Sequence, residues 1–144
     1  IVTIMSLSNQ IGKLKETITR KSIYVQTNVV KRLMKDLVYY KMEVETQKEK
    51  ITSMELGGKD PYDVNKQGEI LGESYMMVHD TEERIEKAVI KLETSLQVYE
   101  DAYHDTSDGM TNDNDSTHEH NTYTGKDADT ILNDAHTMIE HYRS

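Results

Sequence analysis

The sequence predicts an all-α protein, an elongated antiparallel three-helix bundle with an additional N-terminal helical extension. Long stretches repeat apolar residues at alternating spacings of three and four, the pattern of helices that bury one seam. Of the 144 residues, 35% are hydrophobic and 30% are charged, and neither Phe nor Trp occurs. The core must therefore be thin and built from Ile, Leu, Val, Met and Tyr, which favours a bundle over a compact globule or a sheet.

The first element is an amphipathic extension over residues 1–21. Its seam has the three-four spacing: Ile4, Leu7, Ile11, Leu14 and Ile18. That register does not continue into the next seam but slips by two residues in the stretch 19–22, which is low in helix propensity. We therefore expect an appended helix that is separate from a bundle over residues 22–144.

The next helix is expected over about residues 27–55, with Leu37 in its core. The sequence "LGGKDPYD" then ends it. Gly57 and Gly58 suit a left-handed C-terminal cap, Asp60 is a good N-cap, and Pro61 suits a first helical position. This turn predicts an antiparallel helical hairpin.

The second bundle helix is expected over about residues 61–103, with Leu92 in its core. Polar or small residues weaken the first half of its seam, and "HDTEE" resembles a second helix start, so we expect an irregularity over Val78 to Thr81. Residues 105–125 offer almost nothing large and apolar to bury and predict a disordered acidic linker. A third helix follows over about residues 127–142.

Charge and composition narrow the function. Residues 1–59 carry 11 basic and 6 acidic side chains, whereas residues 60–144 carry 6 basic and 20 acidic ones, which gives a net charge of −9. This balance argues against nucleic acid as a partner. The lack of Cys suits a reducing compartment, and no apolar run reaches the ~20 residues of a membrane span. We expect a cytoplasmic protein without a membrane partner.

Motifs for chemistry are weak. The His clusters "HEH" and "HTMIEH" have poor ligand spacing, "DNDSTHE" lacks the Gly and Glu of a calcium loop, and "TGKD" lacks the upstream Gly of a phosphate loop. We expect no enzyme activity, no catalytic residue, no metal and no cofactor. Gly68 and Gly72 cost about 1 kcal/mol each inside a helix. They are either neutral variation or a shallow groove for a partner's backbone.

Two stretches resemble the tubulin-binding cofactor A family. "TNVVKRLMKDLVYY" is similar to the signature of its first helix, and "PYDVNKQGEILGESYMMVHD" is similar to its tract of Tyr-Asp, Lys-Gln, Glu-Ile-Leu, Glu-Ser and Met-Met. The resemblance covers about residues 21–88. His79 stands where relatives commonly carry Pro, so no proline kink is implied, and the leader and the acidic linker are longer than the family's minimal form.

The resemblance implies a spectrin-like three-helix fold and a chaperone that captures quasi-native β-tubulin for folding and heterodimer assembly. It implies β-tubulin as the partner, allows other tubulin cofactors, and implies a cytoplasmic, cytoskeleton-associated location. Tyr beside Arg is also the composition of interface anchors. The candidate β-tubulin-binding residues are Lys31, Arg32, Lys35, Tyr39, Lys66, Glu69, Glu73 and Arg84.

The alternative is a generic helical-bundle adaptor or coiled-coil protein, in which the seam of the helix over residues 27–55 pairs with another protein. The turn "GGKDPYD" favours an intramolecular bundle, because an adaptor coil would more naturally continue its heptads. The extra seam of the leader leaves both a monomer and a homodimer open.

Overall fold

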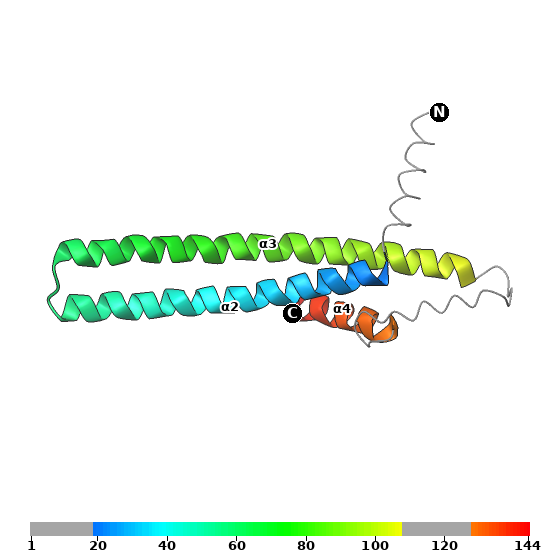
Figure 1. Ribbon diagram of the computed structural model, residues 1–144, viewed down its shortest axis with the longest axis horizontal. Coiled ribbons are helices and arrows are strands. Elements are labelled where there is room, and N and C mark those ends of the chain that lie inside the picture. The colour runs from blue at the N-terminus through cyan, green and yellow to red at the C-terminus, as the bar shows by residue number, and fades with distance from the viewer. Residues whose placement is uncertain (1–18, 108–127) are drawn as a thin grey trace, which may run out of the picture. The chain divides into compact units, whose positions relative to one another are not determined.

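The computed structural model describes residues 19–107 and 128–144, and these form three α-helices and no strand (Figure 1). The helices are α2 (Arg20–Leu56), α3 (Pro61–Ser107) and α4 (Ala128–Arg143). The predicted all-α fold with three bundle helices is confirmed. Residues 1–18 of the predicted extension and residues 108–125 of the predicted linker lie outside the described residues, so both segments stay predictions.

Helix α2 begins at Arg20, earlier than the predicted start near residue 27. The reason is a cap at Thr19. The Thr19 backbone N–H donates to Ser22 Oγ at 3.1 Å, and the Ser22 N–H donates to Thr19 Oγ1 at 3.3 Å. This reciprocal pairing satisfies two N–H groups that a helix start otherwise leaves without partners. A helix N-terminus therefore lies within the stretch 19–22, where the register of the apolar seam slips.

The turn between α2 and α3 forms as its residues predict. Gly58 has φ 64°, the left-handed conformation of a C-terminal cap. The Lys59 N–H donates to the Met54 carbonyl at 3.0 Å, and the Gly58 N–H donates to the Glu55 carbonyl at 3.1 Å, which together make a Schellman motif. Asp60 Oδ1 accepts the Tyr62 N–H at 3.0 Å, so Asp60 caps α3 as predicted.

Helix α3 runs without a break from Pro61 to Ser107, so the predicted irregularity at Val78 to Thr81 is wrong. The hydroxyl of Thr81 is buried and donates to the Met77 carbonyl at 2.7 Å, so this polar residue is satisfied within the helix. The helix also passes the predicted end near residue 103 and includes residues 105–107 of the predicted linker. A loss of apolar residues does not itself stop a helix, and the next Gly is Gly109.

The chain divides into two compact units. The first, which we call the terminal unit, consists of Ile1–Val29 and Val89–Ser144, and the second, the hairpin unit, is Val30–Ala88. In the terminal unit, α4 is joined to α3 by an ion pair of Arg143 with Glu93 at 3.0 Å and a contact of His136 with Glu100 at 2.6 Å. Its buried apolar residues come from all three helices: Ile23, Val89, Leu92, Leu96, Ile131 and Ala135.

The hairpin unit has a much smaller core. Its buried apolar residues are Val30, Val44 and Ile85, and no residue from 45 to 80 is buried. Leu92 in the terminal unit is fully buried as predicted, but Leu37 in the hairpin unit is only half-buried, so its assignment to the core is corrected. Only α2 and α3 form this unit, and two helices cover less of each seam than three.

Candidate functional site

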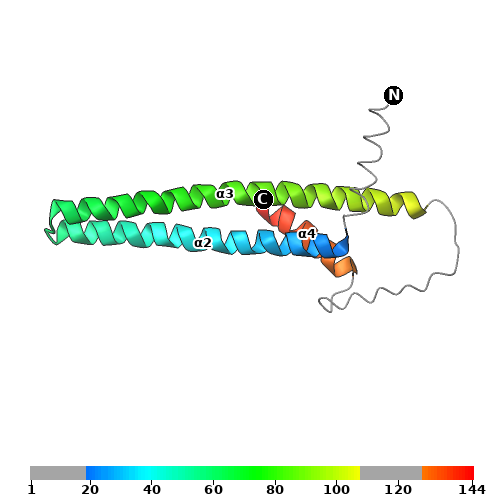
Figure 2. The same cartoon turned by 45° about the horizontal axis from the view of Figure 1, so that its top comes forward.

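The candidate site is the surface of the hairpin unit, where α2 and α3 run antiparallel on either side of their seam (Figures 1 and 2). The seam contains a contact between two amides, in which Gln47 Nε2 donates to Gln67 Oε1 at 2.8 Å and to the Gln67 carbonyl at 3.1 Å. Both residues are half-buried. This pair holds the two helices together where the seam has few apolar residues.

One side of the hairpin is closed by contacts between its helices. Lys41 Nζ lies 3.1 Å from Glu82 Oε1, and Lys48 Nζ lies 5.6 Å from the ring centroid of Tyr75. Each of these four residues follows a seam residue by four positions, so all of them share one side. We call this the clasped side.

The opposite side carries the residues that directly precede seam residues. On α2, Arg32 and Tyr39 come just before the seam residues Leu33 and Tyr40. On α3, each candidate on this side likewise comes just before a seam residue: Lys66 before Gln67, Glu73 before Ser74 and Arg84 before Ile85. We call this the open side. Its members from the predicted set are Arg32, Tyr39, Lys66, Glu73 and Arg84.

The structure separates the predicted residues by side. Lys35 and Glu69 lie on the outer faces, away from the seam, and Lys31 follows a seam residue and belongs to the clasped side. Lys31 is half-buried, while the other seven candidates are exposed. Most of the predicted residues therefore lie on the open side, whereas Lys31, Lys35 and Glu69 do not.

The charged candidates on α3 form ion pairs along their own helix. Lys66 Nζ lies 3.3 Å from Glu69 Oε2 and 5.6 Å from the Tyr62 ring centroid, and Arg84 Nε lies 3.2 Å from Asp80 Oδ2. Exposed ion pairs of this kind contribute only about 0–1 kcal/mol. These side chains can therefore exchange partners at little cost.

The sequence analysis missed the apolar part of this surface. Tyr39 is 60% exposed, and it is joined on the open side by Ile70 and Met77, which are 44% and 41% exposed. The spacing of seven between Ile70 and Met77 was the available signal. Among the residues whose side chains the structure describes, the exposed large apolar ones other than Val25 and Ile90 belong to the hairpin unit: Val38, Tyr39, Met42, Leu56, Tyr62, Ile70, Tyr75, Met76 and Met77.

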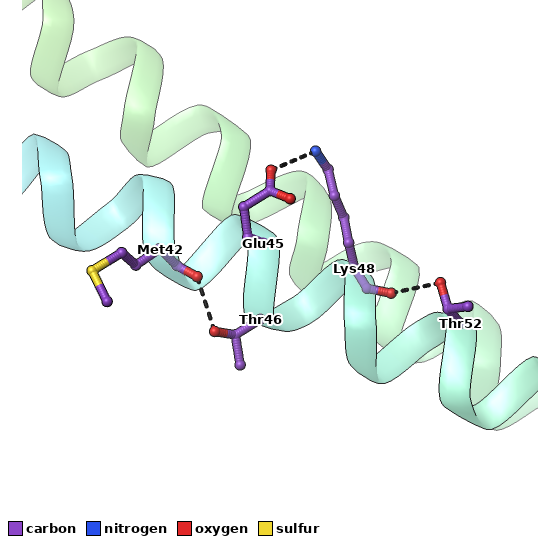
Figure 3. A network of polar contacts seen from close by, with 5 residues as sticks. All are labelled: Met42, Glu45, Thr46, Lys48 and Thr52. Atoms are coloured by element: carbon purple, nitrogen blue, oxygen red, sulfur yellow. Dashed lines mark hydrogen bonds and ion pairs between the residues drawn. The ribbon is translucent and has the colours of Figure 1, made fainter.

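A local network on α2 shows the electrostatics of the hairpin surface (Figure 3). Lys48 Nζ donates to Glu45 Oε1 at 2.8 Å, and the hydroxyl of Thr52 donates to the Lys48 carbonyl at 3.0 Å. The hydrogen bond that Lys48 donates to Glu45, and then its hydrogen bond with Tyr75, raise the pKa of the Lys48 ammonium above its ordinary value. Lys48 therefore stays charged, in contrast to a lysine tuned for proton abstraction.

Across residues 19–107 and 128–144, no group of three or more His, Cys, Asp or Glu could hold a metal ion. In the same ranges, no helix has the length and hydropathy to cross a membrane. The His118 to His120 cluster lies outside the described residues.

A helical chain that exposes apolar side chains among exposed charges, on a hairpin with a small core, belongs to the class of protein-binding helical proteins. The sequence model of one family, tubulin binding cofactor A, matches residues 18–112. The chain belongs to this family.

Relatives and solved structures agree with this assignment. The chain is 43% identical to human tubulin-specific chaperone A over 77 residues, which cover 54% of this chain and 71% of the human protein. It is 37% identical to tubulin-folding cofactor A of Arabidopsis thaliana over 83 residues, 58% of this chain and 74% of that protein.

Two solved structures share the fold. The crystal structure of tubulin folding cofactor A from Arabidopsis thaliana matches with a TM-score of 0.60 at 25% identity, covering 86% of this chain and 94% of that one. Human tubulin chaperone cofactor A matches with a TM-score of 0.58 at 28% identity, covering 87% and 98%. The two relatives are named as a tubulin-specific chaperone and a tubulin-folding cofactor, and neither name denotes an enzyme.

Proposed function

We propose that this chain is a tubulin-folding chaperone that captures quasi-native β-tubulin on the way to heterodimer assembly. The observation that carries the proposal is the family match over residues 18–112, which includes the whole hairpin unit and every candidate β-tubulin-binding residue. The names of the relatives supply the client, tubulin, and the resemblance of the two sequence stretches supplies the β-subunit.

The surface of the hairpin unit suits reversible capture. Exposed apolar side chains offer contact area to a client that has not yet buried its own, and long charged side chains with local ion pairs can rearrange around it. Methionines at the surface, such as Met42 and Met76, adapt to irregular partners because their side chains are unbranched and flexible. None of this requires a nucleotide or a metal ion.

The same proposal places the chain in the cytoplasm in association with the cytoskeleton, with other tubulin cofactors as further partners. Release of the client then depends on competition by those partners and not on a chemical step. Both a monomer and a homodimer are compatible with this role.

The test is charge reversal of the basic candidates on α2. Arg32 and Lys35 are exposed, so Arg32→Glu with Lys35→Glu should leave the fold intact, whereas Lys31 is half-buried and is kept. Charges at the edge of an interface mainly set the association rate. We expect association with purified β-tubulin about 3- to 10-fold slower at low salt, with a weaker dependence on ionic strength.

The matched control is Lys59→Glu with Lys91→Glu, which changes the net charge equally at exposed positions outside the candidate set. Association that slows only in the Arg32 and Lys35 variant supports these residues as part of the site. Equal rates in both variants would remove them from the site while leaving the client intact. Absence of β-tubulin binding by the unmodified chain would refute the proposed function.

A further inference from the structure

Helix α2 carries an exposed apolar cluster on its surface away from the seam. Val38, Tyr39 and Met42 are 60%, 60% and 64% exposed. Met42 follows Val38 by four residues and Tyr39 by three, so the three side chains are neighbours on the helix surface. Contiguous apolar side chains with this exposure are typical of a surface that binds another protein.

Charged residues of opposite sign lie at the two ends of this cluster. Arg32 and Lys35 lie toward the α2 N-terminus, and Glu45 and Glu49 lie toward its C-terminus, and all four are exposed. Lys35, Met42 and Glu49 are seven residues apart, so a cation, an apolar side chain and an anion follow one line along the helix. We call these four charged residues and the apolar cluster the outer face of α2.

The nearby charges of contrary sign lie beside the seam and not on this face. Asp36, Glu43 and Lys50 directly precede seam residues and therefore belong to the open side. Lys48 belongs to the clasped side, where it lies over the Tyr75 ring. The outer face therefore has a basic end, an apolar centre and an acidic end.

The charged groups of the outer face have few partners within the chain. In the part of the chain that the structure describes, the side chains of Arg32, Lys35 and Glu49 form no hydrogen bond or ion pair. Glu45 accepts a hydrogen bond from Lys48 Nζ at 2.8 Å along α2 (Figure 3). An exposed pair within one helix holds its side chains only weakly. All four charges are therefore available to a partner.

The order of these charges is complementary to itself. Lys35 lies five residues before position 40 and Glu45 five residues after it, while Arg32 and Glu49 lie eight before and nine after. A two-fold axis at about position 40 makes two copies of α2 run antiparallel, and each basic end then meets the other copy's acidic end. The two apolar clusters face each other at the axis. This complementarity favours a second copy as the occupant, because a face of one sign would repel its own copy.

We propose that the outer face of α2 is a self-association surface, through which two copies of the chain pair antiparallel about a two-fold axis. One helix face per copy makes an interface of the small class, which buries less than about 1,200 Å² in total and is weak. The dimer therefore forms at high protein concentration. Arg32, Lys35 and Tyr39 are also candidate β-tubulin-binding residues, so the dimer keeps them covered while the chain is concentrated.

Charge reversal at either end of the face tests the pairing in the full-length chain. Sedimentation equilibrium at about 0.15 M salt screens the long-range repulsion between copies that each carry a net charge of −9. We expect the unmodified chain to pass from monomer to dimer between about 5 and about 500 μM. Arg32→Glu with Lys35→Glu, and separately Glu45→Lys with Glu49→Lys, should each dimerise at least about 10-fold more weakly, because like charges then meet.

A mixture of the two variants should restore the dimer. One variant is acidic at both ends of the face and the other is basic at both ends, so the two should pair with each other at least as tightly as the unmodified chain pairs with itself. Lys59→Glu with Lys91→Glu is the matched control for net charge, since both residues are exposed and lie off the outer face. The control should dimerise within about 2-fold of the unmodified chain.

A distance between spin labels tests the antiparallel arrangement. The chain has no Cys, so Ser53→Cys carries the only label, at an exposed position beyond the acidic end. Two antiparallel copies place their labels about 26 residues apart along the paired helices, which is about 40 Å at ~1.5 Å per residue. Parallel copies would place them within about 20 Å, because packed helices lie about 8–10 Å apart.

Several results would overturn the proposal, and none of them depends on tubulin. An unmodified chain that stays monomeric up to about 500 μM has no such surface. Charge variants that dimerise as well as the control would show that another segment holds the dimer, such as the apolar seam of residues 4–18. A mixture that fails to pair, or labels within about 20 Å, would exclude the antiparallel contact. The proposed function stands or falls separately, on binding of β-tubulin.

Discussion

The terminal unit and the hairpin unit use similar helices for different ends. In the terminal unit, residues at the seam and beside it are buried, including Val89 and Leu96, because a third helix is present. In the hairpin unit, the position equivalent to Val89 and Leu96 is held by Tyr75 and Glu82, which remain exposed. The difference teaches that stability and binding surface are concentrated in different parts of one chain: a closed core in one unit and exposed apolar side chains in the other.

The largest expected effect is on the free energy of unfolding, and one substitution in each unit tests the difference between the two cores. Leu92 is fully buried, so Leu92→Ala should lower the free energy of unfolding by about 2–5 kcal/mol through lost burial and a cavity. Leu37 is half-buried, so Leu37→Ala should lower it by only about 1 kcal/mol. Chemical denaturation measures both values. Equal losses would show that the hairpin core is as closed as the terminal one.

The Leu37 result also marks a limit of sequence reasoning. A heptad pattern shows which side of a helix faces a partner, but it does not show how many helices cover that side. Ile70 and Met77 were missed for a related reason: they lie beside the seam, where the heptad pattern does not show whether a side chain is covered. Side chains beside the seam are buried in one unit and exposed in the other without a change in periodicity.

Features fixed by local chemistry were predictable. The turn at Gly57 to Pro61 needs only a residue that tolerates positive φ, an acidic cap and a proline, and all of these act within a few residues. Thr81 was misjudged because a polar seam residue followed by acidic residues was interpreted as a second helix start. In the structure, its hydroxyl donates to the carbonyl of Met77 in the preceding turn, and the helix continues.

An intermediate effect concerns the glycines of α3. A Cβ added at Gly68 or Gly72 would meet nothing within 4 Å, so each Gly→Ala change should raise the free energy of unfolding by about 0.5–1 kcal/mol. Gly58 is the control, because its φ of 64° strains any Cβ, and Gly58→Ala should lower stability by about 1 kcal/mol. Thermal melts at equal pH compare the three variants.

The glycine variants also sharpen the choice of binding side. Gly68 and Gly72 share the clasped side with Tyr75, so their substitution should leave β-tubulin affinity unchanged if the client docks on the open side. Weaker binding by a stabilised Gly→Ala variant would instead support a groove in which the partner's backbone approaches the glycines, and would move the docking surface to the clasped side.

The smallest expected effect is the contribution that the charged form of Lys48, on the clasped side, makes to the free energy of unfolding. The hydrogen bond to Glu45, followed by that to Tyr75, raises the pKa of Lys48 above its ordinary 10.5. A raised pKa in the folded state means that the contribution to stability is fully present below about pH 10.5 and is lost as the pH rises through the folded value. Because the ammonium is in solvent, the contribution should be too small to shift a melting curve.

An NMR titration of the Lys48 side chain can detect what a melting curve cannot. Glu45→Gln removes the larger cause and should bring the pKa of Lys48 back toward 10.5, and Tyr75→Phe should lower it by less. The reverse order would show that the contact between α2 and α3 outweighs the pair within α2. The clasped side would then be held together more firmly than its exposed charges suggest.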